Sequence, residues 1–233
     1  MFKKSKSKIK NRTEKARKLI TLENPKSPVS EQFRTLRTNI SFSTPGSQLQ
    51  KLLITSSVQQ EGKSTVSANL ACVFAQNNTK VLFIDADMRK PTVHNTFGVK
   101  NAVGLSTYLT EQSTLKQTIQ PTEVENLDIM SAGPVPPNPS ELLNSKNLDI
   151  MLDELCTYYD LIIFDSPPVL SVTDSQIISA KVDGMVLVID KQENNKSNVK
   201  EACDLLTVSE NSKLLGIVFN NDEYDTDKYY VYQ

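Results

Sequence analysis

The sequence has no apolar run long enough to cross a membrane, which excludes an integral membrane protein of the helical kind. A membrane-spanning helix needs roughly 18 consecutive apolar residues, and none of the 233 positions begins such a stretch. The basic N-terminus also lacks the apolar segment of a signal peptide. We therefore expect a cytoplasmic protein.

Histidine and cysteine are scarce as well. The chain has one histidine, His94, and three widely spaced cysteines without a CxxC pair, Cys72, Cys156 and Cys203. This count excludes a zinc site and a disulfide framework. Each cysteine lies among apolar neighbours in a predicted helix, so we expect three buried small hydrophobes rather than nucleophiles. His94 is expected in a loop.

Glycine and proline are too few, at 7 and 11 residues, for a collagen-like or low-complexity chain. With 38% hydrophobic residues, the composition indicates a globular protein. Its length suits one α/β domain with tails.

The net charge of −1 conceals a basic segment at the N-terminus. Residues 1–18 hold nine Lys or Arg and a single acidic residue, Glu14. We expect residues 1–25 to form a flexible basic arm, with attraction to an anionic membrane surface as an alternative role. The rest of the chain is acidic, and nucleic-acid binding is not expected because it needs a basic face on the folded body.

From residue 51 onward, short apolar runs alternate with amphipathic stretches. Uninterrupted apolar runs are typical of strands buried on both faces, and their alternation with helices predicts a doubly wound, mostly parallel sheet flanked by helices. The runs lie at 52–54, 81–84, 161–164, 185–189 and 214–219, and the predicted helices at 63–77, 141–158, 174–181 and 195–209.

A further amphipathic helix is predicted ahead of the first strand. Ser30 is its expected N-cap and Phe42 its end, with apolar residues at spacings of three and four.

Asp174 is a second expected N-cap, and residues 133–139, which hold four prolines, are expected in a loop. We place the folded domain at residues 26–221.

The stretch Ser57-Val-Gln-Gln-Glu-Gly-Lys-Ser-Thr65 follows the first predicted strand and precedes a helix. It matches the P-loop pattern GxxxxGK[ST] except that Ser57 replaces the first glycine. In a P-loop, backbone N–H groups surround phosphate oxygens at a helix N-terminus, the lysine reaches the β- and γ-phosphates, and the hydroxyl binds Mg²⁺. We therefore expect a P-loop NTPase type of fold that binds nucleotide through Gln60, Glu61, Gly62, Lys63, Ser64 and Thr65.

Aspartates end the next two predicted strands. The second apolar run leads into Asp85-Ala-Asp87, and the third ends at Asp165. Since the carboxyl ends of parallel strands line the ligand crevice of such sheets, we expect the three carboxylates to converge near the phosphates. Hard oxygen ligands of this kind suit Mg²⁺.

Taken in order, these motifs resemble the bacterial tyrosine kinases of capsule and exopolysaccharide gene clusters. The resemblance is carried by GKST after a strand, by apolar runs ending in DADMR and DSPP, by GPVPPNPSELL at 133–143, and by a terminal tyrosine cluster. Glu31, Arg34 and Arg37 also resemble the ExxRxxR oligomerisation motif of that family. The resemblance covers residues 26–232.

The resemblance implies an ATP- and Mg²⁺-dependent protein tyrosine autokinase that regulates capsular or exopolysaccharide synthesis. Such a chain is the cytosolic kinase half of a split system, recruited to the inner face of the cell membrane. Its implied partners are a membrane-embedded activator of the polysaccharide co-polymerase type, further copies of itself in a ring, and a cognate tyrosine phosphatase.

The resemblance also implies roles by position. Lys63 holds the β- and γ-phosphates, Thr65 contacts the nucleotide phosphates, and Ser64 and Asp165 serve Mg²⁺. Asp85 is the candidate base for the substrate tyrosine and Asp87 the candidate for a water or metal contact, although these two roles could be exchanged. The implied phosphoacceptors lie in a flexible tail, residues 222–233, and are Tyr224, Tyr229, Tyr230 and Tyr232.

Two departures from the family pattern lie in the loop, where Gln59 and Gln60 replace a proline and a small residue. A positive φ at residue 60 would cost about 1 kcal/mol, so we expect weakened but not abolished nucleotide binding. Arg89 could neutralise phosphate or pair with an aspartate.

Two other functions stay open. A deviant P-loop partition ATPase would share the sheet and the aspartates, but it needs a second lysine early in the loop, where this chain has Ser56-Ser-Val58. The second alternative is a non-catalytic nucleotide-binding scaffold of a polysaccharide assembly, which the sequence does little to exclude.

Overall fold

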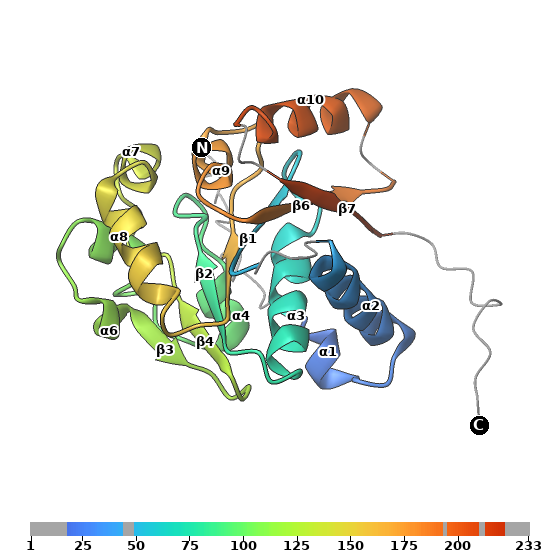
Figure 1. Cartoon of the computed structure of the whole chain (residues 1–233), viewed down its shortest axis with the longest axis horizontal. Helices are drawn as coiled ribbons and strands as arrows, with labels where there is room; N and C mark the ends of the chain where they lie inside the picture. Colours follow the sequence, from blue (N-terminus) through green and yellow to red (C-terminus); the bar gives the residue numbers. More distant parts are fainter. Residues whose placement is uncertain (1–17, 44–48, 193–194, 210–212, 222–233) are drawn as a thin grey trace, which may run out of the picture.

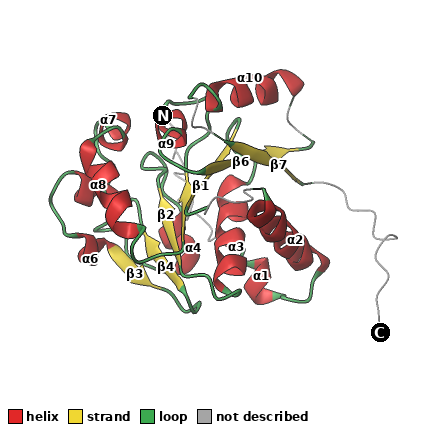
Figure 2. Cartoon of the chain, viewed as in Figure 1, coloured by secondary structure: helices red, strands yellow, loops and turns green. Residues whose placement is uncertain are grey.

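The computed structural model describes residues 18–43, 49–192, 195–209 and 213–221. In these ranges one seven-stranded sheet has the strand order β3-β4-β2-β5-β1-β6-β7. Its neighbouring strands are parallel except for β3 and β4, which are antiparallel. Helices flank the sheet on both faces (Figure 1, Figure 2). The predicted doubly wound, mostly parallel architecture is confirmed.

The strands are β1 Lys51–Ser56, β2 Val81–Asp85, β3 Ile119–Pro121, β4 Leu127–Met130, β5 Leu161–Asp165, β6 Gly184–Asp190 and β7 Leu214–Asn220. The helices are α1 Ile20–Glu23, α2 Pro28–Phe42, α3 Lys63–Ala75, α4 Val93–Phe97, α5 Leu105–Leu109, α6 Leu115–Thr118, α7 Pro139–Leu143, α8 Lys146–Leu155, α9 Asp174–Ser179 and α10 Lys196–Leu206. All five apolar runs of the sequence are strands. The short strands β3 and β4 were not predicted.

Two apolar cores cover the two faces of the sheet. One core, which includes Leu53, packs against α5 and α7 to α10, and the other, which includes Ile54, packs against α2, α3 and α4. Because neighbouring residues of a strand point to opposite faces, β1 needs apolar side chains at both positions. This burial on both faces explains the uninterrupted apolar runs of the central strands.

Helix α3 lies between the sheet and the helices α1 and α2 (Figure 1). Eleven of its 13 residues are buried, including the polar Asn69. The Asn69 amide accepts the N–H and the hydroxyl of Thr21 and donates to the carbonyls of Lys18 and Thr65. Thr21 is fully buried, so the folded body begins before residue 26, the boundary expected from the sequence.

Both predicted N-caps are wrong. Ser27 caps α2, where its hydroxyl accepts the N–H of Ser30 at 3.2 Å and Pro28 occupies the first helical position. Ser30 instead lies buried in the first turn and donates to the carbonyl of Asn24 at 2.7 Å. Asp174 is the first residue of α9 after the N-cap Thr173, and its carboxylate has another partner, described below.

Some smaller expectations also change. The predicted helix 141–158 is two helices, α7 and α8. His94 lies in α4 rather than in a loop. Cys72 is buried as expected, whereas Cys156 and Cys203 are only partly buried. Within the described ranges, no helix combines the length and the apolarity needed to cross a bilayer.

Candidate active site

The strand order brings the carboxyl ends of β2, β5 and β1 together at one edge of the sheet. Asp85 on β2 and Asp165 on β5 are register partners, and Ile54 on β1 is the partner of Asp165 on the other side. The loop that follows β1 therefore emerges next to Asp165, and Asp85 lies one strand further along the sheet. This edge is where open α/β sheets bind ligands.

The loop between β1 and α3 has the conformation of a phosphate cradle. Gln60 has φ of 71° and Gly62 has φ of 84°, so both lie in the left-handed region. The positive φ considered for residue 60 is thus present, at a cost of about 1 kcal/mol for a residue with a Cβ. At Gly62 a Cβ would lie 2.0 Å from Asn220 Nδ2, so a side chain there would displace the Asn220 amide, and the left-handed φ itself favours glycine.

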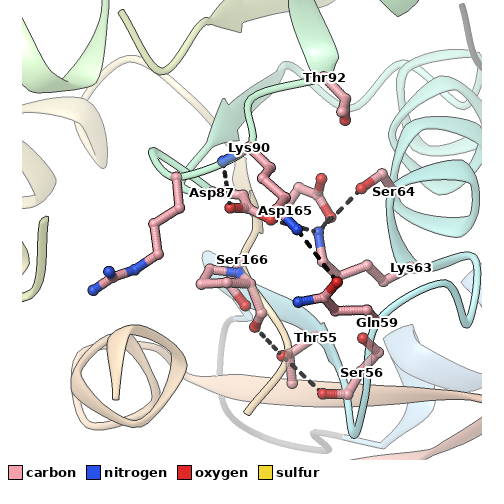
Figure 3. A network of polar contacts seen from close by, with 12 residues as sticks. Thr55, Ser56, Gln59, Lys63, Ser64, Asp87, Lys90, Thr92, Asp165 and Ser166 are labelled. Atoms are coloured by element: carbon pink, nitrogen blue, oxygen red, sulfur yellow. Dashed lines mark hydrogen bonds and ion pairs between the residues drawn. The ribbon is translucent and has the colours of Figure 1, made fainter. Parts of the chain in front are cut away.

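Lys63, the first residue of α3, points its ammonium group at two carboxylates. Its Nζ lies 3.3 Å from Asp87 Oδ2 and 3.5 Å from Asp165 Oδ1, and it donates to Ser64 Oγ at 3.1 Å (Figure 3). Burial lowers the pKa of Lys63, but the charges of Asp165, Asp87 and Asp85 outweigh burial and raise the pKa above its ordinary value. The lysine is therefore a cation at neutral pH.

Asp85 is fully buried and held by backbone donors. Its Oδ2 accepts the N–H groups of Thr92 and Val93, both at 3.0 Å, and its Oδ1 accepts the N–H of Asp87 at 3.2 Å. Burial and the charge of Asp165 raise the pKa of Asp85 to about 8, against the Val93 N–H and Lys63, which lower it. Asp85 can therefore exchange a proton near neutral pH.

Asp165 is also fully buried. Its Oδ1 accepts the hydroxyl of Ser67 at 2.9 Å and faces Lys63. Its Oδ2 is buried and has no hydrogen-bond partner among the described residues. A buried oxygen without a donor is costly, and a bound cation or a further hydrogen-bond donor would satisfy it.

The donor set fits Mg²⁺ held jointly with phosphate. Ser64, Asp87 and Asp165 supply hard oxygens around one lysine, and Mg²⁺ commonly takes one or two carboxylates together with substrate phosphates. In the part of the chain that the structure describes, no group of three His, Cys, Asp or Glu residues forms a protein-only metal cluster.

Three residues that contact this region were not predicted from the sequence. Ser67 lies one turn after Lys63 and orients Asp165. Lys90 Nζ donates to Gln59 Oε1 at 3.3 Å and so links the loop after β2 to the P-loop (Figure 3). Asn220, the last residue of β7, contacts the P-loop from a position 159 residues away. The sequence carries no local signal for any of these contacts.

Arg89 pairs with an aspartate, one of its two expected roles. Its Nε and Nη2 donate to the buried carboxylate of Asp174 at 2.9 and 3.0 Å, and Nη2 also donates to Ser140 Oγ. The pair ties the loop that carries Asp87 to α7 and α9.

The proposed oligomer residues on α2 have partners within the chain. Arg34 pairs with Glu31 and donates to the carbonyl of Pro25 at 2.8 Å. Arg37 donates to the carbonyl of Val73 in α3 at 3.1 Å. The four tail tyrosines and residues 1–17 lie outside the described residues.

Comparison with known proteins places the chain among kinases. Residues 58–208 match the family model described as an AAA domain. Tyrosine-protein kinase YwqD of Bacillus subtilis is 45% identical over 216 residues, which cover 93% of this chain and 91% of the relative. Putative tyrosine-protein kinase CapB of Staphylococcus aureus is 46% identical over 208 residues, which cover 89% and 91%.

Solved structures agree on the fold. The chimerical protein CapA2B2 matches with a TM-score of 0.85 and 44% identity over 90% of this chain and 93% of that one. The septum site-determining protein MinD of Pyrococcus horikoshii matches with a TM-score of 0.62 and 24% identity over 73% and 70%. At that identity, the likeness to MinD concerns the fold alone and does not support the partition-ATPase alternative.

Proposed function

The chain belongs to the bacterial tyrosine-protein kinases, and from this premise we propose that it uses ATP and Mg²⁺ to phosphorylate its own C-terminal tyrosines, Tyr224, Tyr229, Tyr230 and Tyr232. The observation that carries the proposal is the convergence of Asp87 and Asp165 on Lys63 at the start of the P-loop helix, with Asp85 buried beside them. Phosphoryl transfer needs mainly positioning and charge neutralisation, and this constellation supplies both.

Lys63 and the backbone N–H groups of residues 60–65 would hold the nucleotide phosphates. To reach them, the Lys63 ammonium would exchange its carboxylate partners for phosphate oxygens, and Asp87 and Asp165 would then be available together with the Ser64 hydroxyl. These three residues would hold Mg²⁺, whose chemistry is to neutralise charge on the phosphates.

Asp85 is the proposed base that takes the proton from the substrate tyrosine. A tyrosine hydroxyl has an ordinary pKa of about 10, and a base works best when its own pKa is near the working pH. With a pKa of about 8, Asp85 is partly ionised near neutral pH, and its ionised form is the one that would accept the tyrosine proton. Exchange of roles between Asp85 and Asp87 is the alternative.

We extend the proposal to the biological setting of the family. The chain would regulate capsular or exopolysaccharide synthesis and respond to a membrane-embedded activator of the polysaccharide co-polymerase type. A cognate tyrosine phosphatase would remove the phosphates from its tyrosines. A relative named for the cps region of Klebsiella pneumoniae supports this setting, with 39% identity over 78% of this chain and 25% of that protein.

Transfer is proposed to occur between subunits. Assembly into a ring through the face of α2 that carries Glu31, Arg34 and Arg37 would place the tail of one subunit near the site of the next, at high effective concentration. Each phosphate adds about −1.5 to −2 charges to an acidic tail, which weakens its docking at an aspartate-lined site and limits the reaction.

The test mixes two proteins that are each unable to label themselves. One is the chain truncated after Asn221, which keeps the active site but has no tail tyrosines, and the other is full-length Lys63→Met. With the cytosolic activator segment and ATP, phosphotyrosine should appear on the Lys63→Met protein at a tail tyrosine. The control mixture replaces the active partner with truncated Lys63→Met.

Absence of label on the inactive partner, while the wild type labels itself normally, would show that transfer between subunits is wrong. Absence of label in the wild type with activator would overturn the autokinase itself.

A further inference from the structure

The P-loop keeps a strained shape with a single glycine. Of residues 57–62, only Gly62 is glycine, yet Gln60 and Gly62 both have left-handed backbone angles. A residue with a Cβ costs about 1 kcal/mol or more in the left-handed region, and in this loop that cost falls on Gln60. Contacts from outside the backbone must therefore hold this loop.

Glu61 supplies the first of these contacts. Its side chain turns into the protein and the residue is only 2% exposed. Its Oε2 accepts the Ser57 hydroxyl and the Val58 N–H, both at 2.8 Å, and its Oε1 accepts the N–H of Asp190 at the end of β6 at 3.2 Å. The Glu61 carboxylate thus connects its own end of the loop to the beginning of the loop, at Ser57 and Val58, and to the end of β6, at Asp190.

Asn220 supplies the second contact, from the strand beyond. It is the register partner of Asp190, and its Nδ2 donates to the carbonyl of Glu61 at 3.0 Å. Because the described peptide bonds are trans, the N–H of Gly62 points away from the carbonyl of Glu61 and so away from the Asn220 amide that this carbonyl accepts. The ammonium group of the next residue, Lys63, faces Asp87 and Asp165.

We infer that Glu61 and Asn220 are positioning residues that brace the P-loop, with the Glu61 carboxylate directed away from the ligand and the Gly62 N–H directed toward it. A carboxylate that touched the nucleotide phosphates would repel them, and the inward position of Glu61 avoids this. The inference refines the expected role of Glu61 as a nucleotide-binding residue, because only its backbone would face the phosphates. It rests on the proposed binding of nucleotide at this loop.

The test measures affinity for ATP and for inorganic tripolyphosphate by calorimetry. Loss of hydrogen bonds to a charged group should make Glu61→Gln bind both ligands roughly tenfold more weakly, and the KM for ATP should rise more than kcat falls. Asn220→Asp, which points an acceptor at the Glu61 carbonyl, should weaken both more than Asn220→Ala does. Ser57→Ala, which removes one donor, should have a smaller effect in the same direction and serves if Glu61→Gln fails to fold.

The matched control is Asp183→Asn at the opposite end of β1. Asp183 Oδ2 accepts the N–H groups of Gln50 and Lys51 at 2.9 and 2.7 Å, so its loss should lower the melting temperature without changing either affinity. Unchanged affinity in Glu61→Gln and Ser57→Ala would overturn the brace, and so would a loss confined to ATP, which would indicate contact with the nucleoside. A wild type that binds neither ligand would overturn the proposed nucleotide site, and the brace with it.

Discussion

Asp85 and Asp165 occupy partner positions on the adjacent strands β2 and β5, and both carboxylates are fully buried. Lys63 faces Asp165 at 3.5 Å, while Asp85 depends on backbone N–H groups. Two neighbouring buried carboxylates cannot both ionise cheaply. One of the two carboxyl groups therefore stays protonated at neutral pH. This group is Asp85, whose pKa is raised to about 8, first by burial and second by the charge of Asp165.

The first prediction follows from this proton. The pKa of Asp85 is about 8 in the folded protein and about 3.9 in an unfolded chain, so between these values the folded state binds more protons. Its contribution to the free energy of unfolding is therefore full below about pH 4 and is lost as the pH rises through about 8. In urea unfolding without nucleotide, the wild type should lose stability from pH 5 to 8 more steeply than Asp85→Asn. Parallel slopes would contradict the raised pKa.

Lys63→Met should lower autophosphorylation by about 100-fold or more, because it removes the cation aimed at the phosphates. Its circular dichroism spectrum should match that of the wild type. Lys51→Met is the matched control, since Lys51 also forms an ion pair, with Asp183 at 3.4 Å, but at the far end of β1. Normal tyrosine labelling by Lys63→Met alone would refute the assigned site.

Gln60→Gly should relieve the left-handed backbone and raise the free energy of unfolding by about 1 kcal/mol. ATP affinity should rise too, because the loop then adopts its binding shape at lower cost. Asn78→Gly is the control, since Asn78 also has a positive φ, 59°, but lies in the turn after α3. It should change stability only, so an equal gain in affinity there would show that the effect is not local to the loop.

Arg89→Met should destabilise the fold by about 1 to 3 kcal/mol, because it leaves the buried carboxylate of Asp174 without its charged partner. Adding Asp174→Asn should recover part of that loss. A double-mutant cycle in urea measures the coupling, and strict additivity would mean that the pair contributes nothing.

Replacing Glu31, Arg34 and Arg37 together with alanine should convert a ring into monomers in light scattering. Since Arg37 also holds the carbonyl of Val73, the triple variant should melt at a lower temperature as well. Arg37→Ala alone separates the two effects: it should lower the melting temperature but disrupt assembly less than the triple variant does. An unchanged mass for the triple variant would leave these residues as a solvated helix face with contacts only within the chain.

Local sequence determined the central strands and the P-loop helix. Strands buried on two faces need consecutive apolar residues, and β1, β2, β5 and β6 each contain an uninterrupted run of three to five of them. The strands β3 and β4 could not be predicted, because Ile119–Pro121 and Leu127–Met130 are three and four residues long and interrupted by polar residues or proline. Ser27 was predictable as the N-cap of α2, since a proline at the first helical position follows it.

The sequence by itself also determined which residues end the strands, and hence that Asp85, Asp87, Asp165 and Lys63 would meet at one edge of a parallel sheet. Tertiary structure decided the rest. The order β2-β5-β1-β6-β7 sets which aspartate neighbours which, and only that order brings Asn220 to the carbonyl of Glu61. Protonation of Asp85 is decided in the same way, because a pKa depends on burial and on charges from other strands, and neither is a property of the residue's own segment.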